Sequence, residues 1–447
     1  MLESAPHAAG NSMEQLSDTP TISAPVDRPA RLWNRNFVLL WQGQMISQLG
    51  NQAFAIAMMF WLMRATGSAS LMGAIMFASM LPGVVLGPFG GTFADRHSRI
   101  RIVLVSDLIS GAAVLALAFA LFDPRAEALE PAAVRFVIGL MFVVAVLQGI
   151  LRSFFTPAIG AAIPDLVPRE KIPAANSLNQ FAVQASSLFG QAIGGVLYQV
   201  LGAAVLFAID GASFLYAGIC AAFIRPPARQ APPKTATDRP FRQFMEETRD
   251  GFRYLWRHAG IRDFTIIASL VNFLGSPILV LFPFYVELYL KEDAQWYGFL
   301  VAAIGAGSIA GFVLAGTIRL TGESRRWAVY SSMLLAPFFF GILGFIRNPY
   351  SALAVVFLGG AALGIINVYL MSMIQVTTPD EVRGRVLGLL VWLAAGLMPL
   401  GMLLGGFVGD LTGKNVPLIF AVCGGTALVV SFILGARRDL REFLAHG

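Results

Sequence analysis

The stretch GGTFADRHSRIR, from Gly90 to Arg101, concentrates charge between two long apolar segments. It carries one aspartate, three arginines and one histidine within twelve residues. The apolar segments on either side, about 71 to 93 and 102 to 122, are each long enough to cross a bilayer as a helix, which takes roughly 20 residues. Charged side chains are costly inside a membrane and settle at its surface. The stretch therefore predicts a short loop that joins two transmembrane helices.

The whole chain has the composition of a membrane protein. Of its 447 residues, 56% are hydrophobic and 13% are charged, and the mean hydropathy is +0.69. Long apolar segments predict helices, because a β-barrel would show short alternating segments instead. We expect an all-α integral membrane protein with twelve transmembrane helices. The predicted spans are about 37–63, 71–93, 102–122, 134–155, 176–200, 203–224, 264–289, 296–318, 327–345, 351–373, 386–408 and 416–435.

The positive charges are distributed unevenly between the two sides of these spans. When the loops are assigned to alternate sides, 26 of the 32 Lys and Arg residues fall on the side that holds both termini. Because cytoplasmic loops carry the excess of Lys and Arg, this asymmetry predicts that both termini are cytoplasmic. The sequence pI near 9.5 reflects the same bias, and we expect no nucleic-acid partner.

The spans divide the chain into two halves. We expect a disordered cytoplasmic arm at 1–34, a six-helix half at 35–224, a cytoplasmic linker at 225–262, a second six-helix half at 263–436 and a cytoplasmic tail at 437–447. The linker begins with prolines and continues with apolar residues at helical spacing, which predicts an amphipathic helix on the membrane surface. This helix is a tether between the halves or a regulatory element. Cys220 and Cys423 lie inside predicted spans, so we expect two free, buried thiols.

The two halves resemble each other in the positions of their glycines and prolines. The register changes at the loop from Asp123 to Pro131, which is longer than its counterpart in the second half. This pattern predicts two parallel six-helix repeats that hold a substrate between them near the membrane midplane, although 45 glycines leave a chance alignment open. A shift of 225 pairs Gly50 with Gly275, Gly73 with Gly298 and Gly91 with Gly316, and a shift of 211 pairs Pro168 with Pro379, Gly190 with Gly401, Gly194 with Gly405 and Gly195 with Gly406.

The charged stretch also matches a known motif. Gly91, Asp95, Arg96 and Arg99 fit the pattern G-x-x-x-D-R-x-x-R, which resembles the loop between the second and third helices of major facilitator superfamily transporters. The resemblance implies that Asp95 interacts with the start of the eleventh helix and helps to hold the cytoplasmic side shut. With Arg101 these residues form a candidate conformational latch, and the alternative is a solvated run of charges.

The fifth span contains a second motif, SSLFGQAIGG. Its Gly190, Gly194 and Gly195 resemble the antiporter motif G-x-x-x-G-P-x-x-G-G, in which Gln191 replaces the proline and removes the expected kink. Glycines at this spacing also let helices pack closely, whatever the function. In the fourth span, the family pattern R-x-x-Q-G places an arginine where this chain has Ala145, so the proton coupling associated with that arginine does not transfer.

Three further segments resemble one branch of the superfamily. They are FFTPAIGAAIPDLVPREKIPAANS at 154–177, ID-x-x-S-F at 209–214 and QVTTPDEVRGRVLGL at 375–389. The branch holds enterobactin-exporter-like, macrolide-efflux-like and lysophospholipid-transporter-like proteins. The resemblance covers residues 35 to 436 and implies export of amphipathic compounds across the cytoplasmic (inner) membrane of a bacterium.

Proton coupling needs a titratable group that both sides can reach. The four histidines lie outside the predicted spans, whereas acids inside a span are functional candidates by default. The candidates are Asp210, about 10 Å into the sixth helix at 1.5 Å per residue, and Asp107 in the third helix, close to the arginines of the latch. A structural hydrogen bond is the alternative explanation for Asp210.

The resemblance also indicates which helices line the substrate cavity. In this fold they are the first, fourth, seventh and tenth, and their polar members here are amides and aromatic residues. Such a lining suits a large, weakly polar ligand, although each residue can also serve helix packing alone. The candidate cavity residues are Gln48, Asn51, Gln52, Gln148, Asn272, Tyr285, Asn367 and Tyr369.

Together these patterns favour a secondary transporter that exports an amphipathic drug, siderophore or secondary metabolite by alternating access, driven by the proton-motive force. A lysophospholipid or lipid flippase of the same superfamily and a transport-dead sensor remain alternatives. An ATP-driven pump or enzyme is disfavoured, because the nearest match to a phosphate-binding loop, GDLTGK at Gly409, is one residue short. We expect protons, the bilayer and a small amphipathic substrate as partners, no cofactor or metal, and a monomer.

Overall fold

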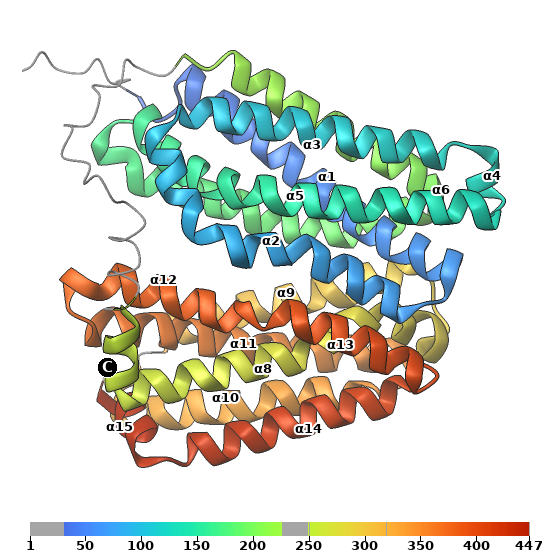
Figure 1. The fold of residues 1–447 in the computed structure, drawn as a ribbon. Coiled ribbons are helices and arrows are strands. Elements are labelled where there is room, and N and C mark those ends of the chain that lie inside the picture. The colour runs from blue at the N-terminus through green and yellow to red at the C-terminus, as the bar shows by residue number, and fades with distance from the viewer. Residues whose placement is uncertain (1–30, 226–248, 250, 319, 447) are drawn as a thin grey trace, which may run out of the picture.

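The computed structural model describes residues 31–225, 249, 251–318 and 320–446, and regular structure in these residues is helical throughout (Figure 1). The helices are α1 (Arg35–Thr66), α2 (Ala69–Arg96), α3 (Arg99–Leu121), α4 (Pro124–Glu127), α5 (Pro131–Leu166), α6 (Ile172–Ala222), α8 (Ala259–Phe284), α9 (Ala294–Thr317), α10 (Gly322–Leu343), α11 (Pro349–Thr377), α12 (Asp380–Gly396), α13 (Met398–Leu411), α14 (Val416–Gly435) and α15 (Arg438–His446), with a 3-10 turn η1 (Arg169–Lys171) and a π-helical turn η2 (Tyr285–Leu290).

Within the described residues, ten helices are long and apolar enough to cross a membrane. The helix α1 is not among them, although it has 32 residues, because its amide side chains lower its hydropathy. The predicted spans 176–200 and 203–224 both lie in the 51 residues of α6, which Gly202 interrupts with a φ of +76°. The predicted span 386–408 is divided between α12 and α13, which meet at Leu397.

Local sequence signals explain where several helices begin and end. The side chains of Asn34 and Ser68 accept hydrogen bonds from the first turns of α1 and α2, and Asn348 and Asn415 do the same for α11 and α14. Gly67 ends α1 in the left-handed conformation and donates its N–H to Met63 O at 2.7 Å. These caps keep the short turns between the helices tight.

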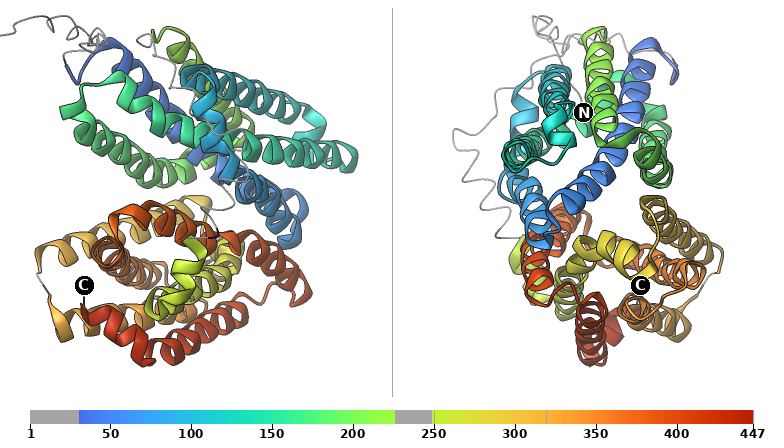
Figure 2. Two further views of the ribbon diagram at one scale, coloured as in Figure 1. Left: turned by 60° about the vertical axis from the view of Figure 1, so that its left-hand side comes forward. Right: turned by 90° about the vertical axis from the view of Figure 1, so that its right-hand side faces the viewer.

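The helices form two groups (Figure 1). The N-terminal group comprises α1 to α6 and the C-terminal group comprises α8 to α14, and the views in Figure 2 show the same division. The long helices run between two ends of the molecule. The linker end holds the turns at 97–98 and 167–171 together with α15, and the far end holds the turns at 67–68, 122–130, 291–293 and 412–415.

The apolar core shows where the two groups are joined. A large cluster toward the far end draws residues from both groups, among them Phe60, Tyr297 and Met402. Toward the linker end, each group has a cluster of its own, one around Phe37 and one around Val329. Among the described residues, the two groups therefore share a core only toward the far end.

The linker end carries structure that the sequence predicted only in part. The tail forms the helix α15, whose Leu440 and Leu444 are buried in the cluster of the C-terminal group. Residues 251–257 are helical, with Leu255 buried and the rings of Phe252 and Trp256 exposed and stacked at 5.3 Å. The rest of the predicted amphipathic helix, and the predicted arm before residue 31, lie outside the described residues. Both cysteines are free thiols as predicted, and Cys220 is buried, whereas Cys423 is only half-buried.

Candidate functional site

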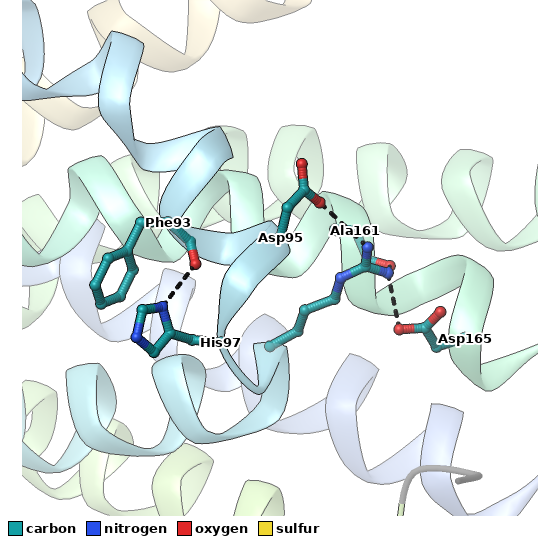
Figure 3. A network of polar contacts seen from close by, with 6 residues as sticks. Phe93, Asp95, His97, Ala161 and Asp165 are labelled. Carbon is teal, nitrogen blue, oxygen red and sulfur yellow. Dashed lines mark hydrogen bonds and ion pairs between the residues drawn. The ribbon is translucent and has the colours of Figure 1, made fainter. Parts of the chain in front are cut away.

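The charged stretch places Arg99 at the centre of a polar cluster at the linker end, and Figure 3 labels its partners Asp95, Ala161 and Asp165. Arg99, the first residue of α3, donates from Nη1 to Ala161 O at 2.7 Å and to Asp165 Oδ2 at 2.8 Å, both on α5. Its Nη2 lies 3.4 Å from Asp95 Oδ1 at the end of α2. The arginine is only 15% exposed, so it ties three helices of the N-terminal group together. Asp165 is a member of this cluster that sequence reasoning missed.

The other members of the predicted latch are more open. Arg96 and Arg101 are exposed, and the Asp95 side chain is 69% exposed and, among the described residues, pairs with Arg99 of its own group. A Cβ at Gly91 would meet nothing within 4 Å of the described atoms. The neighbouring Gly90 is the residue that lets α2 approach α5, because a Cβ there would overlap the carbonyl oxygen of Ser153.

At the far end, the start of α2 is joined to the end of α13 by a carboxylate. Asp410 accepts hydrogen bonds from the backbone N–H groups of Ala69 and Ser70, both at 2.9 Å, and from the Ser68 hydroxyl at 2.8 Å. A carboxylate at a helix N-terminus satisfies free N–H groups and complements the helix dipole. Asp410 therefore caps α2 from the opposite group, a role that no sequence pattern pointed to.

Below this cap, α2 and α13 are in backbone contact, and we call this interface the α2–α13 seam. A Cβ at Gly73 would overlap the carbonyl oxygen of Met402, and a Cβ at Gly406 would overlap that of Ala69. Each helix thus presents a glycine to a carbonyl oxygen of the other. The seam can close only if both positions lack a side chain.

A second interface, the α6–α9 seam, repeats this arrangement. A Cβ at Gly298 would overlap the carbonyl oxygen of Gln191, and a Cβ at Gly195 would overlap that of Ala294. The Tyr297 hydroxyl adds a contact to the Met59 sulfur of α1 at 3.6 Å. A third link between the groups lies closer to the linker end. Trp392 Nε1 on α12 donates to Val84 O, about halfway along α2, at 3.0 Å.

The glycines of the motif in the fifth predicted span allow α6 to pack closely against two helices, α1 and α9. Gly190 and Gly194 face α1, where added Cβ atoms would lie 2.8 Å from Gln52 Cβ and 3.0 Å from Ala53 Cα, and Gly195 faces α9. Gln191 Nε2 donates to Gln52 Oε1 at 3.0 Å and to Ser187 Oγ at 3.1 Å. The helix keeps helical dihedral angles at Gln191 and departs from them only at Gly202.

The two candidate coupling acids both lie against α1 and are buried. Gln44 Nε2 donates to Asp107 Oδ2 at 3.1 Å. Asp210 is 0% exposed, and neither of its carboxyl oxygens has a hydrogen-bond partner among the described atoms. The nearby Ser213 hydroxyl donates to the Asp210 carbonyl oxygen at 2.7 Å, and Gly50 leaves the room that the Asp210 carboxyl occupies, because a Cβ there would lie 2.9 Å from Oδ1.

The predicted cavity residues fall into two sets. Gln48, Asn51 and Gln52 on α1 are half-buried, Gln148 has a buried Nε2 with no partner among the described atoms, and Asn272 and Asn367 are exposed. Asn272 Nδ2 donates to Ala394 O at 3.0 Å and Asn367 Nδ2 to Leu363 O at 2.9 Å.

The two tyrosines are packed inside the C-terminal group instead. Tyr285 is 0% exposed and donates to Ile346 O at 3.0 Å, and Tyr369 is 8% exposed and donates to Ile318 O at 3.2 Å. Both hydroxyls are therefore engaged with backbone of neighbouring segments. Ala145, where the family pattern places an arginine, is buried in the far-end cluster.

Comparison with known proteins identifies the family. The profile described as transmembrane secretion effector, a class of major facilitator superfamily proteins, matches residues 28–446. The chain belongs to this family. This transporter is therefore a multi-pass membrane protein, and relatives of the family function in efflux.

Two curated relatives and one solved structure illustrate the match. Macrolide efflux protein A of Streptococcus pyogenes is 25% identical over 414 residues, which covers 92% of this transporter and 98% of the relative. The enterobactin exporter of Escherichia coli O139:H28 is 25% identical, with 82% and 81% covered. A bacterial homologue of the iron transporter ferroportin, crystallised in an inward-facing state, has a TM-score of 0.67 at 17% identity, covering 90% of this transporter and 99% of that chain, and so shares its fold.

Proposed function

We propose that this transporter has twelve transmembrane helices in two parallel six-helix repeats. The proposal counts α1 as a span and divides α6 at Gly202 into two. It is supported by the two seams, whose residues correspond under the sequence shifts. Gly73 and Ala69 of α2 match Gly298 and Ala294 of α9 under the shift of 225, and Met402 and Gly406 match Gln191 and Gly195 under the shift of 211. Equivalent helices thus make equivalent contacts.

The excess of Lys and Arg assigns the linker end to the cytoplasm and the far end to the outside. The observation that carries the proposed mechanism is the position of the core that the two groups share. Because the groups share this core only toward the far end, the proposed state is closed to the outside. The cytoplasmic ends of the two groups have separate cores and are not held together by a shared one. Alternating access then requires the seams to open as the cytoplasmic ends approach each other.

The proposed cargo is an amphipathic small molecule such as a drug, a siderophore or a secondary metabolite, exported from a bacterial cell. The amides of α1 and α5, together with Asn272 on α8 and Asn367 on α11, supply hydrogen-bonding groups on otherwise apolar helices. Such a surface suits a ligand held by apolar contact and oriented by a few hydrogen bonds. Relatives named for the efflux of macrolides and the export of enterobactin support this class of cargo.

For coupling we propose Asp210 as the proton carrier, with Asp107 as the second candidate. An unpaired carboxylate at 0% exposure costs several kcal/mol, so the group is suited to hold a proton in this state and to release it when water reaches it. Asp107 already has the Gln44 amide as a partner at 3.1 Å. A proton-motive force of ~150 mV, about 3.5 kcal/mol per charge, supports a gradient of a few hundred-fold.

The test is the retention of dyes and antibiotics, including a macrolide, in bacteria that lack their own efflux pumps and express this transporter. We expect lower retention than in cells with an empty vector, and we expect a protonophore to abolish the difference. Asp210→Asn should express normally and lose the protonophore-sensitive efflux. Asp123→Asn, which changes an exposed acid in the turn between α3 and α4, is the matched control and should transport normally.

Other outcomes would redirect the proposal. Proton uptake that is insensitive to Asp210→Asn would exclude Asp210 as the carrier. If no compound is exported, transport of lysophospholipid by the purified protein in liposomes would favour the flippase. Absence of any flux, combined with a cellular response that depends on Asp95, would favour the sensor.

A further inference from the structure

A small recess lies at the linker end of the C-terminal group, between α10, the end of α14 and α15. Its volume is about 260 Å³ including the open mouth. It is separate from both seams and from the candidate coupling acids. The recess is lined by Arg326, Trp327, Tyr330, Gly435, Arg441 and Leu444.

The recess is built by specific contacts. A Cβ at Gly435 would overlap the ring of Tyr330, so this glycine allows the ring to lie against the end of α14. The helix α15 closes another side, because Leu444 is 1% exposed and its carbonyl oxygen accepts a hydrogen bond from Arg325 Nε at 3.4 Å. Residues of three helices, α10, α14 and α15, therefore fix the walls of the recess.

The charge of the lining is positive. Arg441 extends from α15 and Arg326 from α10, and the Arg326 guanidinium lies 5.5 Å from the Trp327 ring. Glu323 pairs with Arg326, with Oε2 2.5 Å from Arg326 Nη2, and its side chain is 67% exposed. Among the described lining residues and their ion-pair partners, two guanidinium groups and one carboxylate leave an excess of one positive charge, with donors suited to a phosphate.

The recess also lies where an apolar surface ends. Below it, α10 and α14 expose large apolar side chains, including Leu335 and Phe338 on α10 and Phe432 and Ile433 on α14. Trp327, which is 58% exposed, stands at the boundary between this surface and the charged groups. Tryptophan and tyrosine are typical of the membrane–water interface. An acyl chain on the apolar surface would bring its headgroup to the recess.

We propose that this recess binds the phosphate of an anionic glycerophospholipid, whose acyl chains lie along α10 and α14. Arg326 and Arg441 bind the phosphate, and Trp327 and Tyr330 hold the glycerol region at the interface. Basic pockets between membrane helices on the cytoplasmic side take lipid headgroups in this way. Because the lipid would contact α15 and α10 together, it fixes the C-terminal helix to the C-terminal group. The inference depends on membrane insertion and on the proposed cytoplasmic position of the linker end, and not on the proposed cargo or coupling.

The experiment is native mass spectrometry of the purified full-length protein with phosphatidylglycerol or phosphatidylcholine. We expect retained phosphatidylglycerol adducts and few of phosphatidylcholine. Arg441→Gln, on the exposed face of α15, should lower the phosphatidylglycerol affinity about fivefold, and the Arg326→Gln, Arg441→Gln double variant should lower it further. Arg438→Gln is the control, because Arg438 is 90% exposed and its Nε bonds Glu442 at 2.7 Å outside the recess lining.

Equal phosphatidylglycerol binding by Arg441→Gln and the unmodified protein would overturn the proposal, as would equal binding of the two lipids. Retained adducts of inorganic phosphate or glycerol phosphate at the same concentrations, lost in Arg441→Gln, would assign the site to a free phosphate instead. The single variant keeps the test valid if the double variant fails to fold. The readout is binding, so failure of the efflux proposal would leave it unaffected.

Discussion

The two ends of this transporter are held by different means. At the far end, the α2–α13 and α6–α9 seams bring glycines onto carbonyl oxygens of the opposite group, and the cores of the two groups merge. At the linker end, the polar cluster around Arg99 lies within one group, and each group keeps its own core. The far end is thus closed by close backbone packing and a shared apolar core. At the linker end, the charged residues lie on two groups whose cores are separate.

A single helix shows the contrast. In the half of α2 toward the far end, Gly73 is in contact with α13, whereas Gly83, Gly87 and Gly91 in the other half have open space where a Cβ would be. In α12, Gly384 likewise has no neighbour within 4 Å among the described atoms. This state therefore uses only part of the close-contact surface that α2 offers.

The largest effect should come from filling the α2–α13 seam. Gly73→Leu forces the seam apart, and overpacking of this kind costs about 1–3 kcal/mol, or about a fivefold to 150-fold shift in the equilibrium between states. We expect efflux to fall by a factor in that range and the far end to become open to a membrane-impermeant thiol reagent at a cysteine introduced there. Gly139→Leu is the control, because Gly139 is exposed and a Cβ there meets nothing within 4 Å. Unchanged efflux by Gly73→Leu would mean that the seam does not have to close.

Removing the Asp410 cap should have a smaller effect in the same direction. Asp410→Ala leaves the N–H groups of Ala69 and Ser70 without their acceptor, which for a helix cap costs about 1 kcal/mol. We expect about a fivefold shift toward the open far end, measured by the same reagent. Asp293→Ala is the matched control in the α6–α9 seam, because Asp293 stands at the N-cap of α9 and makes no side-chain capping bond. Equal shifts in the two variants would remove the distinction between the seams.

The smallest effect on stability should come from the linker end. Asp95→Asn breaks an exposed ion pair with Arg99, and such pairs contribute about 0.2–1 kcal/mol. We expect an unchanged melting temperature and a loss of efflux, because the proposed latch uses this charge when the linker end closes. Glu442→Gln, which breaks another exposed pair at the same i,i+4 spacing, should affect neither. Full efflux by Asp95→Asn would show that this charge takes no part in closure.

The sequence predicted the helices well where length and apolar content decide. The structure differs from the predicted spans at a helix break and at a polar helix cap, which depend on individual residues. The break at Leu397 was missed although Gly396 and Pro399 flank it, because the apolar run continues through them. The end of that predicted span at residue 408 also left Asp410 outside it, and its partners on α2 are 340 or more residues away in the chain. Contacts at that separation depend on the packing of whole helices.

The candidate site was predictable to a similar extent. The shifts of 225 and 211 paired Gly73 with Gly298 and Gly195 with Gly406, but they did not reveal that each of these glycines faces the opposite group. The tyrosines show the limit of assigning a site by helix. Tyr285 belongs to a helix that lines the cavity in the family, yet its side chain turns into the core, because one helix has lining and buried faces.

The amides of α1 have a consequence for how the chain is made. This first helix is too polar to match the hydropathy of the ten apolar helices, and those of its amides that have hydrogen-bond partners among the described residues include two whose partners lie on helices synthesised later. Gln44 bonds Asp107, 63 residues on, and Gln52 bonds Gln191, 139 residues on. At about 5–20 residues per second, α1 waits about 7–28 s for that second partner. On the proposed twelve-helix topology, α1 therefore has to be sheltered from lipid during biosynthesis, by the insertion machinery or by α2, until α6 arrives.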